Sequence, residues 1–280
     1  MLAAGVVLAG GRSSRMGTSK AGLAWHGSTL LRRTVGVVAR GVAGPVVVVR
    51  APGQPLPQLP VDVEVRDDDH EGLGPLQGLS VGLHALNGVA DVAFCCSTDM
   101  PFLHTAFVAR VVQAMDDDYD VVLPVARGHR QPLAAAYRPS LAADIDDLLA
   151  AGQLKPAFLF DRCRVLRLTD DELLADRALA ASDPTLESLV NVNEPADYQQ
   201  AQARPAPAVQ VECFGVLARN GHRGARTVRA ATISSAAQAA ELVFDHHVVA
   251  AVNGDQVTRD GSTPLVAGDT VTFVSADAGG

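Results

Sequence analysis

Residues 8–20 have the sequence Leu8-Ala9-Gly10-Gly11-Arg12-Ser13-Ser14-Arg15-Met16-Gly17-Thr18-Ser19-Lys20. The stretch follows an apolar run, Ala3–Val7, that predicts a buried strand, and precedes Ser28–Val35, where the hydroxyl of Ser28 is a candidate helix cap. Glycines let backbone N–H groups approach anionic oxygens closely, and arginine and lysine neutralise the negative charge. The sequence therefore predicts a phosphate-binding loop between a strand and a helix. Its spacing is neither that of a P-loop nor that of a Gly-x-Gly-x-x-Gly dinucleotide fingerprint.

Length and composition limit the class of protein. The chain has 280 residues, enough for two domains, and its 48% hydrophobic content predicts packed cores. A net charge of −8 argues against a general nucleic-acid binder. No apolar run approaches the roughly 20 residues that span a bilayer. Because Met1 leads directly into the first strand and leaves no room for a signal peptide, we expect a cytoplasmic protein.

The four cysteines, Cys95, Cys96, Cys163 and Cys213, contain no Cys-x-x-Cys pair. This spacing predicts buried reduced thiols rather than a zinc site or a disulfide framework. The run Asp116-Asp117-Asp118 is expected to be a solvated face.

From residue 3 to about 203, strand-like and helix-like segments alternate. This order predicts an α/β domain: a Rossmann-like, three-layer fold with a mostly parallel sheet, whose ligands gather at the carboxyl ends of the strands. The expected strands are Ala4–Leu8, Pro45–Val49, Val61–Arg66, Asp91–Cys96, Asp120–Val125 and Leu133–Tyr137, and the expected helices include Leu76–Leu86 and Leu103–Met115.

A short segment rich in proline and alanine, residues 204–208, is expected to link domain 1–203 to a second domain, 209–280. The second domain has about 70 residues and predicts a small α+β fold with the order β-β-α-β-β. Its expected elements are strands Val209–Phe214, Thr227–Ala230, Val248–Val252 and Thr270–Val274, a helix Ser234–Phe244 capped by Ser234 or Ser235, and a tight turn at Asn253-Gly254.

Three further motifs carry candidate site residues. Asp99 lies in Ser97-Thr98-Asp99-Met100-Pro101, which directly follows the strand Val92–Cys96. It should reach the edge of the sheet where residues 8–20 lie, a place suited to Mg²⁺ held by one carboxylate and substrate phosphates. Asp67 precedes Leu73-Gly74-Pro75-Leu76-Gln77-Gly78-Leu79, where small residues would let a helix N-terminus approach a base or ribose. Asn193, in Val190-Asn191-Val192-Asn193-Glu194-Pro195, could contact the metal or phosphates, or cap a helix.

Together these motifs resemble the molybdenum cofactor guanylyltransferases (MobA-like) over residues 3–200. The resemblance implies Mg²⁺-dependent transfer of GMP from GTP to the terminal phosphate of molybdenum-bound molybdopterin, with release of pyrophosphate. It assigns GTP binding to Leu8, Ala9, Gly10, Gly11, Lys20, Asp67 and Gly74, Mg²⁺ binding to Asp99, and a place near the acceptor or metal to Asn193 and Gln131. Lys20 and Arg15, with the metal on Asp99, would stabilise the negative charge of the triphosphate during transfer.

One segment departs from the family pattern: Arg50-Ala51-Pro52-Gly53 stands where many members carry an asparagine. A cytidylyltransferase of the same cofactor pathway, or a guanylyltransferase with another phosphorylated acceptor, therefore stays open.

The C-terminal sequence ends in Asp277-Ala278-Gly279-Gly280. With Ala250–Asp255 and Thr263–Val271 it resembles the β-grasp sulfur carriers (MoaD/ThiS-like). That resemblance implies a Gly280 carboxylate that an E1-like enzyme adenylylates and that then carries sulfur to a synthase subunit. The alternative from another class is a protein that acts chiefly as a sulfur carrier or docking protein, with a vestigial transferase half.

Overall fold

The computed structural model describes residues 1–10, 19–68, 70, 72–215, 217–220 and 224–276. Its contacts divide the chain into two compact units. The first comprises Met1–Leu23 and Leu30–Tyr198, and the second Ala24–Thr29 and Gln199–Gly280. The predicted site residues Gly11, Arg15, Gly279 and Gly280 lie outside the described residues.

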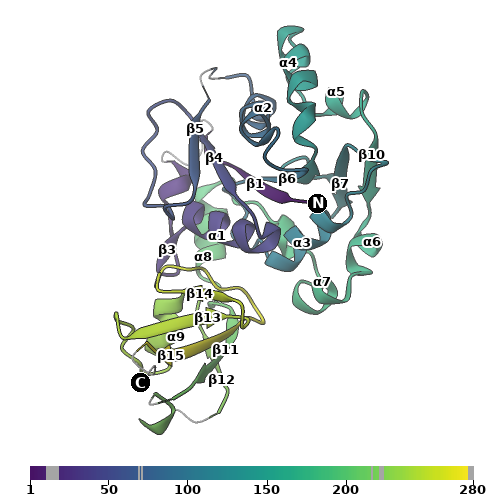
Figure 1. The fold of residues 1–280 in the computed structure, drawn as a ribbon. Helices are drawn as coiled ribbons and strands as arrows, with labels where there is room; N and C mark the ends of the chain where they lie inside the picture. Colours follow the sequence, from purple (N-terminus) through teal and green to yellow (C-terminus); the bar gives the residue numbers. More distant parts are fainter. Residues whose placement is uncertain (11–18, 69, 71, 216, 221–223, 277–280) are drawn as a thin grey trace. The chain divides into compact units, whose positions relative to one another are not determined.

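A sheet of eight strands, counted over the described residues, forms the middle of the first unit (Figure 1). Its order is β10-β7-β9-β6-β1-β4-β5, and β8 pairs with β7. Neighbouring strands are parallel except β9, which is antiparallel to β6 and β7, and β8, which is antiparallel to β7. The bounds are β1 Ala3–Leu8, β4 Val46–Arg50, β5 Glu64–Asp67, β6 Val92–Ser97, β7 Val121–Ala126, β8 His129–Arg130, β9 Ala134–Tyr137 and β10 Val165–Leu168. The expectation of a largely parallel sheet is confirmed.

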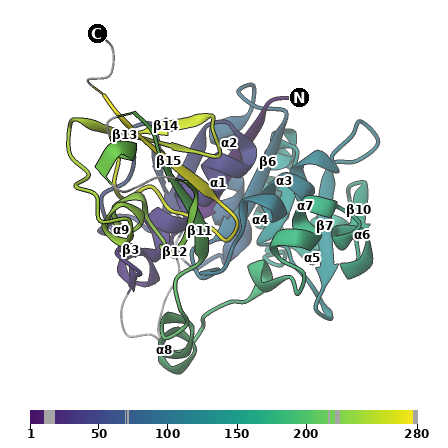
Figure 2. The ribbon, with the colours of Figure 1, turned by 90° about the horizontal axis from the view of Figure 1, so that it is seen from below.

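Helices cover both faces of this sheet, giving three layers (Figures 1 and 2). Gly5 and Val6 are consecutive on β1, so their Cα–Cβ directions point to opposite faces. A Cβ on Gly5 would lie 2.3 Å from Val38 of α1, whereas a Cβ on Gly82 of α2 would lie 2.4 Å from Val6. Helices α1 and α2 therefore pack on opposite faces. The helices of this unit are α1 Leu30–Val42, α2 Pro75–Leu86, α3 Thr105–Gln113, α4 Ala142–Ala150, α5 Ala157–Phe160, α6 Asp170–Leu174 and α7 Arg177–Ser182, with 3₁₀ turns at Lys20–Gly22, Pro139–Leu141 and Glu187–Leu189.

The central strands are apolar throughout because both of their faces are covered. All six residues of β1 and the four valines of β4 are buried. Tyr137, on β9, is also fully buried, and its hydroxyl donates to the carbonyl of Pro132 at 2.7 Å. Burial raises the pKa of the Tyr137 hydroxyl far above its usual value.

Several elements of residues 1–203 differ from expectation. Ser28 does not cap α1: it lies in β3 (Ser28–Thr29), which pairs with β2 (Ala24–Trp25), and the helix begins at Leu30. The expected strand Val61–Arg66 is shorter and later, because Val63 is still bonded to Pro60 in a turn and β5 begins at Glu64. Strand β10 and helices α4 to α7 carry no motif, and sequence reasoning did not identify them.

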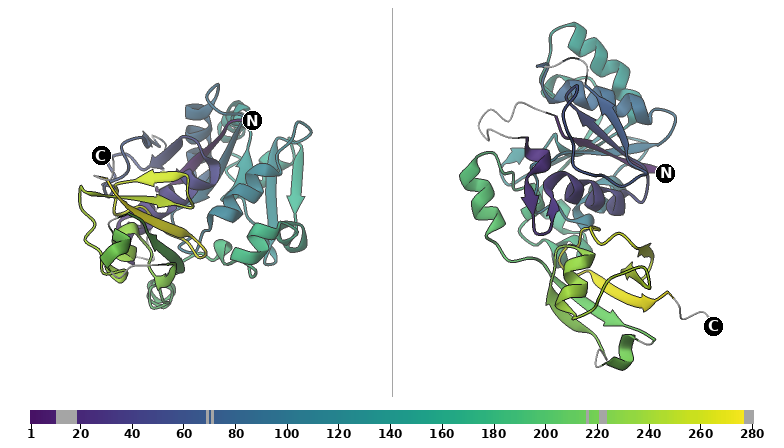
Figure 3. Two further views of the ribbon diagram at one scale, coloured as in Figure 1. Left: turned by 60° about the horizontal axis from the view of Figure 1, so that its bottom comes forward. Right: turned by 90° about the vertical axis from the view of Figure 1, so that its left-hand side faces the viewer.

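The second unit contains a separate sheet of five strands, again counted over the described residues, with the order β12-β11-β15-β13-β14. The two central strands, β11 and β15, are parallel, and the other neighbours are antiparallel. Figure 3 shows these strands in green to yellow with a short helix, α9, against one face. The bounds are β11 Ala208–Cys213, β12 Arg226–Arg229, α9 Ile233–Ala239, β13 Val248–Val252, β14 Gln256–Thr258 and β15 Thr270–Ser275, preceded by α8 Pro195–Gln202, with a 3₁₀ turn at Leu217–Asn220.

Two details of this unit correct the sequence reading. Helix α9 is capped by Thr232, not by Ser234 or Ser235, because Thr232 and Ser235 exchange side-chain and backbone hydrogen bonds in a capping box. An additional strand, β14, follows the turn at Asn253-Gly254, where both residues have positive φ, 55° and 89°. Val252 pairs with Gln256, so three residues, Asn253 to Asp255, form the hairpin loop, and the prediction of a tight turn is confirmed.

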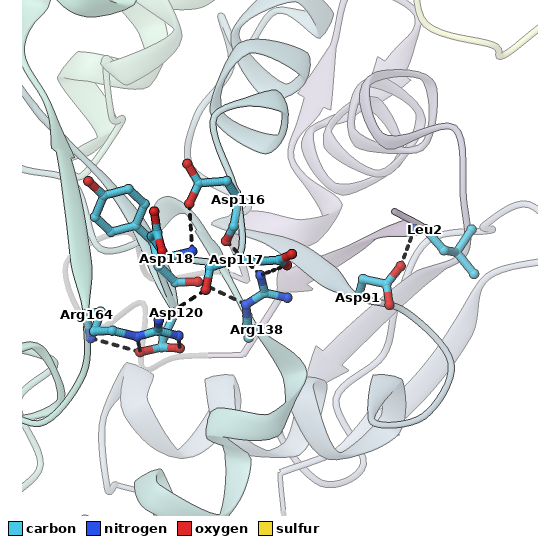
Figure 4. Close-up of polar contacts among 9 residues, drawn as sticks. Leu2, Asp91, Asp116, Asp117, Asp118, Asp120, Arg138 and Arg164 are labelled. Atoms are coloured by element: carbon cyan, nitrogen blue, oxygen red, sulfur yellow. Dashed lines mark hydrogen bonds and ion pairs between the residues drawn. The ribbon is translucent and has the colours of Figure 1, made fainter.

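The acidic run is exposed, as expected, but two arginines pack against it (Figure 4). Arg138 donates to the carbonyl of Asp116 at 2.7 Å, and Arg164 donates to both carboxylate oxygens of Asp120. The hydrogen bond from the Arg164 side chain holds the pKa of Asp120 below its usual value. Arg138 also forms an ion pair with the Asp117 carboxylate at 3.3 Å, so the exposed run is tied to the end of β9 by one arginine.

Among the described residues, no helix combines the length and the apolar character that crossing a bilayer requires. The four cysteines form no disulfide, as predicted: three are buried and Cys163 is half-buried. Burial raises the pKa of the Cys96 thiol, and the negative charge of the neighbouring Asp99 carboxylate raises it further. The thiol therefore stays protonated.

Candidate functional site

Four parallel strands of the first unit end at the same edge of the sheet. Leu8, the last residue of β1, is in register with Ser97 of β6 and with Val49 of β4. Arg50 of β4 is in register with Asp67 of β5. The segments that follow these strands are therefore brought together, although they are far apart in the sequence. This is the edge where open α/β sheets bind ligands.

Lys20, Asp99 and Asn193 meet at this edge. The ammonium of Lys20 donates to Asp99 Oδ2 at 2.9 Å and to Asn193 Oδ1 at 3.1 Å. The side chains of Lys20 and Asp99 are 19% and 17% exposed, so the pair is largely shielded but still open to solvent. The structure thus unites three of the predicted site residues.

Hydrogen bonds from neighbouring residues hold the Asp99 side chain and the turn that follows it. Ser97 Oγ donates to Asp99 Oδ1, and the backbone carbonyl of Asp99 accepts from Val192 N at 2.9 Å. Buried Arg33, on α1, donates to the carbonyl of Pro101 at 2.6 Å and so holds the turn that follows Asp99. A charged side chain buried against carbonyls stabilises a fixed loop conformation.

Asn193 is held by the start of α8. The carboxylate of Asp197 accepts from the backbone N–H groups of Asn193 and Glu194 at 3.1 and 3.0 Å. The side-chain oxygen of Asn193 accepts from Lys20, so it is directed to the edge that carries Asp99. A cap for α8 provided by Asn193 stays a prediction.

The oxygen atoms gathered around Lys20 fit a hard cation. Carboxylate and amide oxygens are ligands that Mg²⁺ accepts, and it completes its shell with water and substrate phosphates. The Lys20 ammonium is itself a cation seated between Asp99 and Asn193. No cluster of three or more His, Cys, Asp or Glu side chains suited to a metal occurs among the described residues. One carboxylate and one amide oxygen at this edge fit a metal that takes its remaining ligands from water and substrate phosphates.

The loop of residues 8–20 begins close to the end of β4. Ala9 N donates to the carbonyl of Val49 at 2.8 Å, and a Cβ on Gly10 would lie 2.9 Å from the backbone nitrogen of Ala51. Glycine is therefore required at position 10 by the close approach of two backbones. Leu8 and Ala9 are buried, so their side chains pack into the core.

Asp67 and Gly74 lie at the β5 side of the same edge. Asp67 Oδ1 accepts from Arg50 Nε at 2.6 Å. Gly74 precedes α2 with φ +76°, a conformation that favours glycine, and Pro75 takes the first position of the helix. In the strand order β6-β1-β4-β5, β1 and β4 separate Asp67, at the end of β5, from Asp99, which follows β6.

Gln131 follows the β7–β8 hairpin. Its backbone N–H donates to the carbonyl of Pro124 at 2.9 Å, and its side chain donates to the carbonyl of Ala126 at 3.3 Å. Strand β7 is separated from β6 by β9 alone, so Gln131 lies on the far side of Asp99 from β1 and β4.

Two residues at this edge escaped sequence reasoning. Ser97 occupies the last position of β6 and bonds Asp99, and Gln54 bonds the loop of residues 8–20. Ser97 could have been found from the sequence, because it is a polar residue at the end of an apolar strand, two positions before an acid. Gln54 follows the turn residues Pro52-Gly53, but nothing in its spacing indicated its partner.

Comparison with known proteins identifies the family. Residues 5–165 match the model of the MobA-like NTP transferase domain. A probable molybdenum cofactor guanylyltransferase from Mycobacterium tuberculosis is 44% identical over 169 residues, which cover 59% of this chain and 82% of the relative. A protein of the same description from Mycobacterium ulcerans is 40% identical over 206 residues, covering 72% of this chain and 94% of the relative.

A solved structure shares the fold. The molybdopterin-guanine dinucleotide biosynthesis protein A from Archaeoglobus fulgidus superposes with a TM-score of 0.56 at 22% identity, covering 71% of this chain and 96% of the other. The edge that carries Lys20 and Asp99 lies in the part of the chain that the family model matches. The chain belongs to the MobA-like NTP transferase domain family and is a nucleotidyltransferase.

Proposed function

We propose that the first unit transfers GMP from GTP to the terminal phosphate of molybdenum-bound molybdopterin, in the cytoplasm, and releases pyrophosphate. The observation that carries the proposal is the meeting of Lys20 with Asp99 and Asn193 at the carboxyl edge of the sheet. The names of the mycobacterial relatives support the choice of guanine and of the acceptor.

In this proposal GTP lies along the edge from β5 to β6. Asp67 and Gly74 contact the base and ribose, and Leu8, Ala9, Gly10 and Gly11 lie against the nucleotide. In the ligand-free protein the N–H groups of Ala9 and Gly10 are bonded to the carbonyl of Val49. Lys20 and Arg15 neutralise the triphosphate. The acceptor approaches from the side of Asn193 and Gln131, beyond β6 in the sheet order.

Mg²⁺ would be held by Asp99 together with phosphate oxygens, and Asn193 stands beside it. When bound, the ion supplies positive charge to the triphosphate. Lys20 must leave Asp99 for the phosphates when GTP and metal enter, because the same Asp99 oxygen would otherwise remain engaged with its ammonium. The ion pair thus keeps the carboxylate oriented before substrate binds.

The reaction needs no covalent intermediate. An oxygen of the acceptor phosphate forms a bond to the α-phosphorus of GTP as the bond from that phosphorus to the bridging oxygen of pyrophosphate breaks. The attacking oxygen belongs to an ionised phosphate, so no base has to remove a proton. Catalysis then consists of alignment and of charge neutralisation by Lys20 and Arg15.

For the second unit we propose a β-grasp sulfur carrier, residues 209–280, joined to domain 1–203 by residues 204–208. A central parallel pair, β11 and β15, flanked by antiparallel strands and packed against α9, supports this fold. The partners would be an E1-like enzyme that adenylylates Gly280 and a synthase subunit that accepts the sulfur. The terminal Gly279-Gly280 suits passage through a narrow channel, since glycine has no side chain.

The transferase proposal is tested by incubating the full chain with Mg²⁺, molybdenum-loaded molybdopterin and either GTP or CTP, and measuring pyrophosphate. Release with GTP and not with CTP is expected. Release with CTP alone would move the activity to the cytidylyl branch, and no release with either would contradict transfer to this acceptor.

The carrier proposal is tested separately by deleting Gly280. Transfer should be unchanged, whereas thiocarboxylate formation, followed by the mass of the intact protein in the presence of an activating enzyme and a sulfur donor, should vanish. Loss of transfer in the deletion variant would show that the tail serves the transferase site and would contradict the carrier role.

A further inference from the structure

Gln54 joins the two ends of the loop between β1 and Lys20. Its Nε2 donates to the carbonyl of Ala9 at 2.9 Å and to Ser19 Oγ at 2.9 Å. Ala9 directly follows β1, and Ser19 directly precedes Lys20. A single amide group therefore holds together two positions that are ten residues apart in the sequence.

The orientation of this amide is determined by its partners. Gln54 Oε1 accepts from Ala51 N at 3.1 Å, while Nε2 faces a carbonyl and a hydroxyl. Rotating the amide by half a turn would place its oxygen against the Ala9 carbonyl and its NH₂ against the Ala51 N–H group. All three contacts are satisfied in one orientation only, so the side chain is a donor toward the loop.

The backbone of Gln54 is fixed as well. Gln54 N donates to the carbonyl of Ala51 at 3.0 Å, and its own carbonyl accepts from Arg50 at 3.1 Å. The same Arg50 guanidinium bonds Asp67, the residue proposed to contact base or ribose. Segment 50–54 thus connects the β5 side of the site to both ends of the loop.

We propose that Gln54 is a positioning residue that ties Ser19, and with it the neighbouring Lys20, to the end of β1 and thereby sets the affinity for the nucleoside triphosphate. The inference rests on the proposed function, because it assumes that the loop binds phosphates. Holding Lys20 in place for a phosphate costs entropy on binding, and bonds already made in the ligand-free protein, which join Ser19 to the end of β1 through Gln54, remove that cost. Because Gln54 holds the loop by its ends and makes no contact with a base, the effect applies to any nucleoside triphosphate.

The test compares four variants of the full chain with the wild type. Gln54→Ala removes all contacts of the amide, and Gln54→Glu keeps its shape but removes both donors. Ser19→Ala removes one partner, and the double variant Gln54→Ala/Ser19→Ala measures their coupling. Gln58→Ala is the matched control, since Gln58 is an exposed glutamine of the same connection whose side chain makes no hydrogen bond to any described residue.

Titration calorimetry with GTP and Mg²⁺, without acceptor, gives the dissociation constant. We expect it to rise about tenfold in both Gln54 variants and about threefold in Ser19→Ala, from the loss of two hydrogen bonds or one. The double variant should be no weaker than Gln54→Ala, since Ser19 has already lost its partner. In turnover assays KM for GTP should rise by the same factors with kcat nearly unchanged, as for a loss of uniform binding.

Four other results are possible, and each contradicts either the positioning role of Gln54 or the proposed transferase activity. Unchanged GTP affinity in both Gln54 variants would refute the positioning role and leave the transferase proposal standing. A fall in kcat together with a lower unfolding temperature, at unchanged GTP affinity, would show a purely structural role and refute it equally. If the wild type binds CTP and not GTP, guanylyl transfer is refuted, and the same losses are then expected with CTP. A wild type that binds neither nucleotide contradicts both proposals.

Discussion

Replacing Asp99 by asparagine removes one negative charge and keeps the size of the side chain. The structure predicts a large loss of turnover and a small loss of stability. In the proposed site the Asp99 carboxylate holds the metal, and Asn would leave the triphosphate charge without that support. Removing one positioned electrostatic group from an active site lowers kcat by about 10²–10³, or about 3–4 kcal/mol.

The stability cost follows from the contacts that are lost. Lys20 and Asp99 are 2.9 Å apart but 19% and 17% exposed, between the surface and buried cases. An exposed ion pair contributes about 0.2–1 kcal/mol, and the asparagine amide oxygen can still accept from Lys20, so we expect a cost of about 1 kcal/mol. For a chain of this size that lowers the unfolding temperature by about 2–4 °C.

The assay pairs pyrophosphate release, at saturating GTP and Mg²⁺ with molybdenum-loaded molybdopterin, with thermal unfolding of the same samples. Asp161→Asn, which neutralises an exposed carboxylate at the end of α5, is the control and should change neither quantity. Turnover of Asp99→Asn within tenfold of the wild type would remove Asp99 from the mechanism. An unfolding temperature lowered by more than about 10 °C would refute the assignment of the Lys20–Asp99 pair as a minor contributor to stability.

Three further predictions concern the site and the fold. Lys20→Ala should raise KM for GTP and lower kcat together, and equal activity would contradict the phosphate-loop assignment. Gly82→Ala places a Cβ 2.4 Å from Val6 in the closed layer between α2 and β1, and should lower the free energy of unfolding by about 1–3 kcal/mol in denaturant titrations; an unchanged midpoint would contradict that packing. The pKa of Asp120 is lowered by Arg164 in the folded state, so its stabilisation is complete above the unfolded value of about 3.9 and is lost as the pH falls through the folded pKa. Asp120→Asn should therefore reduce stability at neutral pH by at most about 1 kcal/mol and flatten its decline in acid, as measured by unfolding at pH 7 and below pH 4.

The central strands were predictable because their chemistry is local. Strands β1, β4 and β6 are apolar runs buried on both faces, and each was expected within one residue of its observed bounds. The bounds of β5 were predicted less accurately, because its residues, Glu64 to Asp67, are exposed and contain no apolar run. The hydroxyl of Ser28 resembled a helix cap, but pairing with Trp25 in a hairpin, a contact outside the helix itself, determined its conformation.

The sequence by itself determined the family and the place of the acid after β6, and it predicts the phosphate-binding role of residues 8–20, because glycines, cations and strand-end carboxylates act at short, fixed spacings along the chain. Only the tertiary structure decided which of these groups meet. Lys20 reaches Asp99 across 79 residues and Asn193 across 173, and Gln54 reaches Ala9 across 45. Such contacts depend on the order β4-β1-β6, which brings the ends of strands from distant segments to one edge of the sheet. No local propensity encodes that order; it follows from burying both faces of the sheet beneath helices, with parallel strands that require long crossovers.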